Sequence, residues 1–209
     1  MKTVKNKKLL YSTKWISYTA ILTALVVATG FIPPLPTPAG RIYWVDGVVL
    51  IAAFLVDPLS AFIAGGVGSL IYDIFKSPEM MLASLLIHGL QGAIVSALLR
   101  FVLRERFKKH EWAKAAVFAV LGAVEVVAGY FIYRCITRGV PAATASIPRN
   151  IIQEAIGISI AVLICYATTF KKQLEKNRLL PDFRSEVRQK ESDAPVCDEA
   201  AAPADDEKQ

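Results

Sequence analysis

Charged residues are scarce in this chain of 209 residues and are absent from long stretches of it. They make up 20% of the sequence, while hydrophobic residues make up 54% and the mean hydropathy is +0.43. Ordinary soluble domains carry about 25% charged and about 45–50% apolar residues. Charges are missing from residues 15–40, 58–72, 80–99 and 155–170. Because about 20 apolar residues span a bilayer core, this pattern excludes a soluble domain and indicates a polytopic helical membrane protein.

Cysteine and histidine are also rare, with three and two residues. Cys135, Cys165 and Cys197 form no CxxC pair, so the sequence supports neither a disulfide framework nor a zinc site. The chain has no HExxH, paired-aspartate or Ser–His motif and no ATP-binding sequence. We therefore expect no catalytic residue, no metal and no cofactor, and any energy source must lie in another protein.

The apolar segments predict an all-α membrane protein with six transmembrane helices. The expected spans are residues 15–32, 44–56, 58–75, 80–103, 113–138 and 148–170. The second span would reach only about 20 Å, which is short of a core of about 30 Å. A re-entrant hairpin formed by the second and third segments is the alternative. Ser146 and Pro148 are interpreted as the cap and first turn of the last helix.

The distribution of Lys and Arg predicts the orientation of the chain in the membrane. Eighteen of these bases lie in residues 1–14, 100–114 and 171–190, against five in the segments on the opposite side. The positive-inside rule therefore places both termini in the cytoplasm of a multi-pass protein of the cell membrane. The bases flank apolar helices and form no stripe, which argues against a nucleic-acid partner.

Composition divides the chain into three regions. Residues 1–14 are expected to form a basic cytoplasmic N-terminus, and residues 15–172 a six-helix membrane domain, to which the resemblance given below assigns substrate binding. Residues 181–209 are rich in Ala, Asp, Glu and Pro and are expected to be a disordered acidic cytoplasmic tail. Four prolines within residues 33–38 predict a semi-rigid outer loop.

Small residues recur every four positions in the first span, at Ala20, Ala24 and Ala28. Such a stripe lets another helix approach closely. It could pack within the same bundle or serve as a docking face for a partner protein, and the sequence leaves both interpretations open. The glycines of the third span, including Gly65 and Gly68, predict close helix packing.

Several polar residues interrupt the apolar helices, where they are costly and usually face the bundle interior. His88 and Gln91 share one face of the fourth span, and Glu125 and Tyr130 lie in the fifth. Asp46 and Asp73 lie near span ends. They are either solvated interface residues or groups that flank an outer cavity.

The start of the last span carries the strongest signal of a site. Asn150, Gln153, Glu154 and Gly157 follow an i, i+3, i+4, i+7 spacing and lie on one helix face. Purely apolar sequence follows, so this face resembles one wall of a polar pocket that opens to the outside. With His88 and Gln91 opposite, these donors and acceptors suit a neutral or zwitterionic heterocycle better than an ion.

These features resemble the substrate-binding S components of energy-coupling factor (ECF) vitamin transporters, and most closely the riboflavin-type group. The resemblance covers about residues 15–172 and the six-span layout. It rests on the alanine stripe, the segment from Gly47 to Asp73 with Asp57-Pro58 and Gly65-Gly66, the sequence His88-Gly89-x-Gln91-Gly92, and Asn150-x-x-Gln153.

The resemblance implies a subunit that captures a vitamin from outside and joins a transmembrane coupling (T) protein and two cytoplasmic ATPases. Riboflavin is the first expected substrate, with a thiamine precursor or pyridoxine as alternatives. Ala20, Ala24 and Ala28 would then form the docking face. The implied substrate-binding residues are Arg41, Tyr43, Trp44, His88, Gln91, Tyr130, Asn150, Gln153 and Glu154.

Two other functions are compatible with the residues alone. One is a helical membrane scaffold or assembly subunit without transport. The other is an intramembrane enzyme built around Glu125 and His88. Binding of a small molecule by the purified protein would separate the first expectation from the scaffold.

Overall fold

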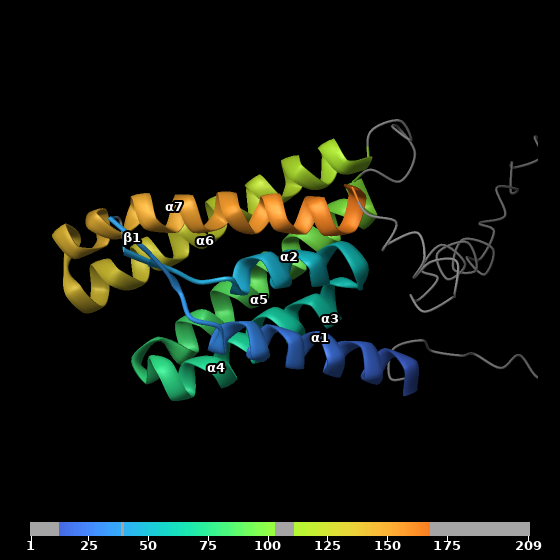
Figure 1. Cartoon of the computed structure of the whole chain (residues 1–209), viewed down its shortest axis with the longest axis horizontal. Helices are drawn as coiled ribbons and strands as arrows, with labels where there is room; N and C mark the ends of the chain where they lie inside the picture. The colour runs from blue at the N-terminus through green and yellow to red at the C-terminus, as the bar shows by residue number, and fades with distance from the viewer. Residues whose placement is uncertain (1–12, 39, 103–110, 168–209) are drawn as a thin grey trace, which may run out of the picture.

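The computed structural model describes residues 13–38, 40–102 and 111–167, which form a bundle of helices along one axis (Figure 1). Most of the expected N-terminal region 1–14 and all of the expected tail 181–209 lie outside the described residues. Within the described part the chain is all-α apart from one small hairpin. This confirms the predicted fold class of a six-helix membrane protein.

Among the described residues, five helices are long and apolar enough to cross a membrane: Thr13–Phe31, Pro58–Lys76, Pro78–Arg100, Glu111–Arg138 and Val140–Tyr166. The elements within them are α1 (Thr13–Phe31), α3 (Pro58–Phe62), η1 (Ile63–Val67), α4 (Gly68–Lys76), η2 (Pro78–Met80), α5 (Met81–Ala97), η3 (Leu98–Val102), α6 (Glu111–Arg138), α7 (Val140–Val162) and η4 (Leu163–Ala167). The predicted spans match these helices except at the start of the last one.

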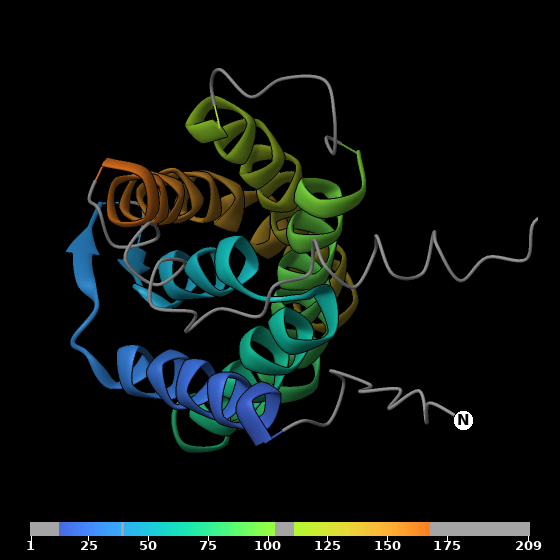
Figure 2. The ribbon, with the colours of Figure 1, turned by 90° about the vertical axis from the view of Figure 1, so that its right-hand side faces the viewer.

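The sixth helix, α2 (Val45–Leu55), is short and lies inside the bundle. Its 11 residues extend about 16 Å, and every one of them is buried. Viewed along the bundle, α2 lies among α1, α5 and α7, with which it makes contact (Figure 2). Asp57 ends this segment and caps α3, since its Oδ1 accepts hydrogen bonds from the backbone N–H groups of Leu59 and Ser60.

The expected start of the last helix at residue 148 is wrong. Helix α7 begins at Val140, and only Gly139, with a φ of +83°, separates it from α6. Residues 140–147, which the expected spans leave as a connection, are therefore helical, and Ser146 and Pro148 lie inside the helix. Proline is tolerated inside membrane helices because neighbouring groups satisfy the backbone atoms that it frees.

The proline-rich loop contains a small antiparallel hairpin. Strands β1 (Leu35–Thr37) and β2 (Gly40–Ile42) pair with Leu35 opposite Ile42. The hairpin lies at the end of the bundle where α6 and α7 meet, and we call this the hairpin end (Figure 1). The starts of α1 and α6 and the end of η4 lie at the opposite end. The described residues next to the three base-rich segments therefore share one end of the bundle.

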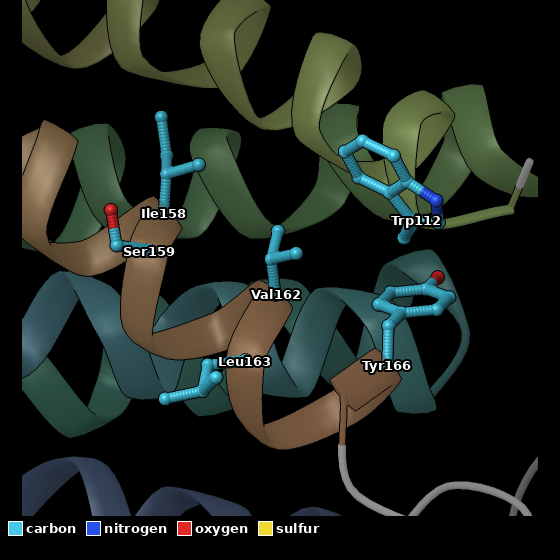
Figure 3. Close-up of a pocket in the computed structure, with 6 residues that line it drawn as sticks. All are labelled: Trp112, Ile158, Ser159, Val162, Leu163 and Tyr166. Carbon is cyan, nitrogen blue, oxygen red and sulfur yellow. The ribbon is translucent and has the colours of Figure 1, made fainter.

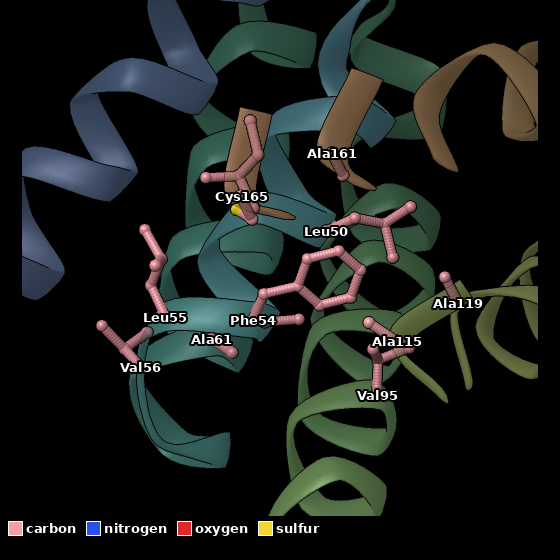
Figure 4. Packing of buried hydrophobic residues seen from close by; sticks show 12 residues of the cluster. Leu50, Phe54, Leu55, Val56, Ala61, Val95, Ala115, Ala119, Ala161 and Cys165 are labelled. Atoms are coloured by element: carbon pink, nitrogen blue, oxygen red, sulfur yellow. The ribbon is translucent and has the colours of Figure 1, made fainter. Parts of the chain in front are cut away.

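Close packing holds η1 against α5, and α7 against α2. A Cβ atom on Gly65 would come within 2.6 Å of the His88 backbone oxygen, and one on Gly157 within 3.0 Å of the Gly47 nitrogen. This confirms the interpretation of Gly65 as a packing residue. Large apolar side chains, among them Leu50, Phe54 and Val95, form a core around α2 (Figure 4).

Candidate functional site

A cluster of buried polar side chains lies in the half of the bundle nearer the hairpin end. Its centre is Asp46, in the first turn of α2, which is 0% exposed. The Asp46 Oδ2 atom accepts a hydrogen bond of 2.6 Å from Gln153 Nε2 on α7. Its Oδ1 atom lies 3.3 Å from Nδ1 of His88 on α5. Polar side chains of three helices therefore meet where α2, α5 and α7 are in contact.

A second contact crosses from α5 to α7 beside the first. Gln91 Nε2 donates a hydrogen bond of 2.8 Å to Glu154 Oε2, and both side chains are almost fully buried. The Gln91 Oε1 atom lies 3.5 Å from His88 Nδ1. Glu154 also lies close enough to Asp46 for the two carboxyl groups to interact. Both acids and the histidine therefore belong to one connected network.

Helix α6 closes the network on the other side of His88. The Tyr130 hydroxyl lies 3.0 Å from His88 Nε2 and 2.9 Å from Ser84 Oγ. The two rings pack edge to face, with their centroids 5.7 Å apart. Asp73, at the end of α4, is also buried and interacts with Ser84 and His88. Four helical segments and α2 therefore contribute to this site.

The segment between the hairpin and α2 is tied to the same network. The Tyr43 backbone N–H donates to Gln153 Oε1 at 3.0 Å, and the Tyr43 ring packs near that of Tyr72, with 6.1 Å between centroids. The Trp44 indole donates instead to the Pro33 carbonyl at 3.1 Å. Arg41 is exposed on β2. The segment that follows the hairpin is thus joined to the network through the Tyr43 backbone N–H.

Three buried polar atoms of the cluster have no hydrogen-bond partner among the described residues. They are Asp46 Oδ1, Glu154 Oε1 and Asn150 Nδ2. The other polar atom of the Asn150 side chain, Oδ1, already accepts a hydrogen bond of 3.1 Å from the Arg149 guanidinium. Buried polar atoms are almost always bonded, so these three atoms are available for hydrogen bonds to a ligand or to ordered water.

The structure brings together most of the residues that the sequence singled out. His88, Gln91, Tyr130, Gln153 and Glu154 join one network, and Asn150 lies beside it. Arg41 and Trp44 make no described bond to it. The expected set omits Asp46, Asp73 and Ser84. Their burial contradicts the interpretation of the two aspartates as solvated interface residues, and a carboxylate directly after the proline loop was the available signal.

The alanine stripe lies on the exposed side of α1 in the described part of the chain. Ala20, Ala24 and Ala28 are all exposed, while Thr19 and Val26 of the same helix are buried against the bundle. Glu125 lies midway along α6, and its Oε2 atom has no described hydrogen-bond partner. No described bond joins it to His88, whose ring nitrogens face Asp46, Gln91 and Tyr130.

A separate apolar groove of about 520 Å³ lies nearer the opposite end of the bundle. Trp112 of α6 and residues of α7 and η4 line it, including Val162, Leu163 and Tyr166 (Figure 3). It contains none of the residues of the polar cluster. The buried network, and not this groove, offers the polar groups that a specific small molecule needs.

Membrane-crossing helices that enclose a buried polar network in one half of the bundle define a polytopic membrane protein with a candidate binding site. Residues 10–170 match the family described as ECF-type riboflavin transporter, S component. The chain belongs to this family, which confirms the resemblance found in the sequence.

The chain is also similar to individual proteins. The chain is 28% identical over 188 residues to the thiamine precursor transporter HmpT of Lactococcus lactis subsp. cremoris (strain MG1363), covering 88% of this chain and 99% of that protein. It is 29% identical over 127 residues to an uncharacterised protein of Pyrococcus woesei, covering 61% and 81%. The S component for biotin from an ECF-type ABC transporter shares the fold, with a TM-score of 0.55, 18% identity and coverage of 78% and 90%.

Proposed function

We propose that this chain is the substrate-capture subunit of an ECF-type importer. It binds a B vitamin or a vitamin precursor from outside the cell and delivers it through an ATPase-driven coupling module. The observation that carries the proposal is the buried network of Asp46, His88, Gln91, Gln153 and Glu154, in a chain that belongs to an S-component family.

The distribution of bases supports capture from outside the cell. The base-rich segments adjoin the end of the bundle opposite the hairpin, so the positive-inside rule assigns the hairpin end to the exterior. The polar cluster then lies in the outer half of a protein of the cell membrane, beneath the hairpin. A substrate would reach it from outside by displacing the segment around Tyr43.

The exposed stripe of α1 supports association with a membrane partner. In lipid, small residues on a helix surface allow another helix to approach closely. We propose that Ala20, Ala24 and Ala28 contact the coupling (T) protein, which in turn joins two cytoplasmic ATPases. This assembly would supply the energy source for which the sequence shows no motif.

Two lines of support differ on the substrate. The description of the matched family names riboflavin. A relative that matches over 99% of its own length is named a thiamine precursor transporter. The residues of the cluster are compatible with several heterocycles, and pyridoxine stays among the candidates. We therefore propose the class of B vitamins and their precursors.

An uptake assay tests this function. The chain is expressed with the T protein and both ATPases of its own organism in cells that cannot import these vitamins, and uptake of labelled riboflavin, thiamine precursor and pyridoxine is measured. Uptake of one of them should require both this chain and ATP hydrolysis, with an inactivated ATPase as the control. Uptake that is unchanged when this chain is omitted would contradict the proposal.

A further inference from the structure

Two arginines lie close together where α6 and α7 pack at the hairpin end, and neither has an acidic partner there. Arg134 of α6 and Arg149 of α7 are both partly buried, and they lie near enough for their charges to repel. The described residues pair neither of them with a carboxylate, whereas Arg138 pairs with Glu79 at 3.5 Å. Like charges repel more strongly away from bulk water, so an anion beside this pair would stabilise it.

The N–H groups of the two arginines are incompletely used. Arg134 Nε is buried and has no hydrogen-bond partner among the described residues. Arg149 donates from Nε and Nη2 to Asn150 Oδ1, at 3.4 and 3.1 Å, and its Nη1 has no described acceptor. Asn150 Nδ2 is a further buried donor without a described partner. Because a guanidinium carries donors and no acceptor, the group that completes these bonds has to be an acceptor.

The arginine pair adjoins both the hairpin and the polar cluster. A Cβ atom on Gly40, whose φ is +123°, would come within 2.9 Å of Arg149 Cδ, so the turn of the hairpin packs on the stem of this side chain. Tyr130 lies near both Arg134 and Arg149. Its hydroxyl also contacts His88 Nε2 at 3.0 Å. A group bound by the arginines would therefore lie next to the cluster, toward the hairpin.

We propose that Arg134 and Arg149 bind a phosphate group at the hairpin end of the bundle. A guanidinium donates two parallel hydrogen bonds to phosphate oxygens, and Arg is suited to this geometry. A phosphate monoester offers three acceptor oxygens and up to two negative charges, so it can accept from the arginines of both helices at once. A carboxylate has two oxygens, which a single guanidinium already matches.

This site is additional to the proposed vitamin site. The phosphate belongs either to the captured molecule, as a phosphorylated vitamin, or to the headgroup of a phospholipid in the leaflet at the hairpin end. Both sources present the same phosphate chemistry to the arginines, so the test uses probes of both kinds.

Three matched pairs of probes, which differ by the phosphate group, test the site on the full chain purified in a phosphate-free detergent. The soluble pairs are pyridoxine phosphate with pyridoxine, and flavin mononucleotide with riboflavin, measured by titration calorimetry. The lipid pair is dioctanoyl phosphatidylglycerol with dioctanoylglycerol, measured by native mass spectrometry. In at least one pair the phosphate-bearing member should bind at least about tenfold more tightly.

Variants tie this preference to the two arginines. Arg134→Gln and Arg149→Gln should each lower the ratio of affinities within the pair to less than about threefold. The ratio is the readout because Arg149 also bonds to Asn150, so its loss can change the affinity of both members. Arg138→Gln is the matched control and should keep the preference, since Arg138 is exposed at the same end and already pairs with Glu79. Thermal unfolding in the same detergent confirms that the variants fold, and if one arginine variant does not, the other decides.

The outcomes also identify the source of the phosphate. A preference within a soluble pair assigns it to the captured molecule, and a preference within the lipid pair alone assigns it to a phospholipid headgroup. Absence of a preference in all three pairs overturns the proposal, as does a preference that both arginine variants retain. The lipid pair does not depend on the proposed function, so the arginine site is decided even if none of the soluble probes binds.

Discussion

Gln153 on α7 and Asp46 at the start of α2 are joined by a hydrogen bond of 2.6 Å across 107 positions of the sequence. The same Gln153 amide accepts from the Tyr43 backbone N–H at 3.0 Å. One side chain therefore orients the central carboxylate of the cluster and fixes the segment that covers it. We propose that Gln153 acts by positioning these two groups.

Replacing Gln153 by Leu should weaken both binding and stability. The change removes a donor from a buried carboxylate and an acceptor from the Tyr43 N–H, and each loss costs about 1–3 kcal/mol. We expect at least about a tenfold loss of vitamin affinity, and a lower unfolding temperature in detergent. Parental affinity in titration calorimetry would show that the Gln153–Asp46 contact does not shape the site.

The Tyr130 hydroxyl should matter more than that of the nearby Tyr133. Tyr130→Phe removes the group that bridges His88 and Ser84, which is worth about 1 kcal/mol or roughly fivefold in affinity. Tyr133→Phe is the matched control, because its hydroxyl donates to the Glu79 backbone carbonyl outside the cluster. Equal affinities of the two variants, measured by titration, would remove Tyr130 from the site.

Much of this arrangement could be predicted from the sequence because helical spacing is a reliable guide inside a membrane. The i, i+3, i+4 pattern that places Gln153 and Glu154 on one face, and His88 with Gln91 on another, requires no tertiary information. Both faces do point into the bundle, since polar side chains avoid lipid.

The errors have physical causes as well. Asp46 resembles an interface residue because α2 is too short to span, and only the tertiary packing of α2 inside the bundle buries it. Pro148 resembles a helix start because proline favours the first turn, yet it lies inside α7. Which polar atoms lack hydrogen-bond partners depends on how three helices pack together. No local sequence pattern could therefore reveal that Asp46 Oδ1 and Glu154 Oε1 lack them.

Enlarging the exposed stripe of α1 should separate binding from transport. Ala24→Leu adds bulk where a partner helix is expected to approach closely, so affinity purification should recover less T protein and uptake should fall at least tenfold. Vitamin affinity of the isolated chain should stay within twofold of the parent, since Ala24 is exposed and distant from the cluster in sequence.

The matched control for this change is Ala128→Leu, which alters an exposed alanine of α6. It should keep both T-protein association and uptake. If Ala24→Leu behaves like Ala128→Leu, the stripe faces lipid and the partner binds elsewhere.

Cysteine labelling tests the orientation. In a cysteine-free background, Pro38→Cys lies on the exposed hairpin and Lys14→Cys at the opposite end of the bundle. Because the bases gather near the end that carries Lys14, a membrane-impermeant maleimide added to intact cells should modify the first and spare the second. The reverse pattern would place the termini outside.

The most direct test of capture by the buried cluster is the small molecule that the protein carries. The parent chain and Gln153→Leu are purified in the same detergent, and the compounds released on denaturation are identified and quantified by mass spectrometry. The parent should release a B vitamin or vitamin precursor at close to one molecule per chain, and the variant should release at least tenfold less. A parent chain that releases none, and binds none when vitamins are added back, would contradict the account.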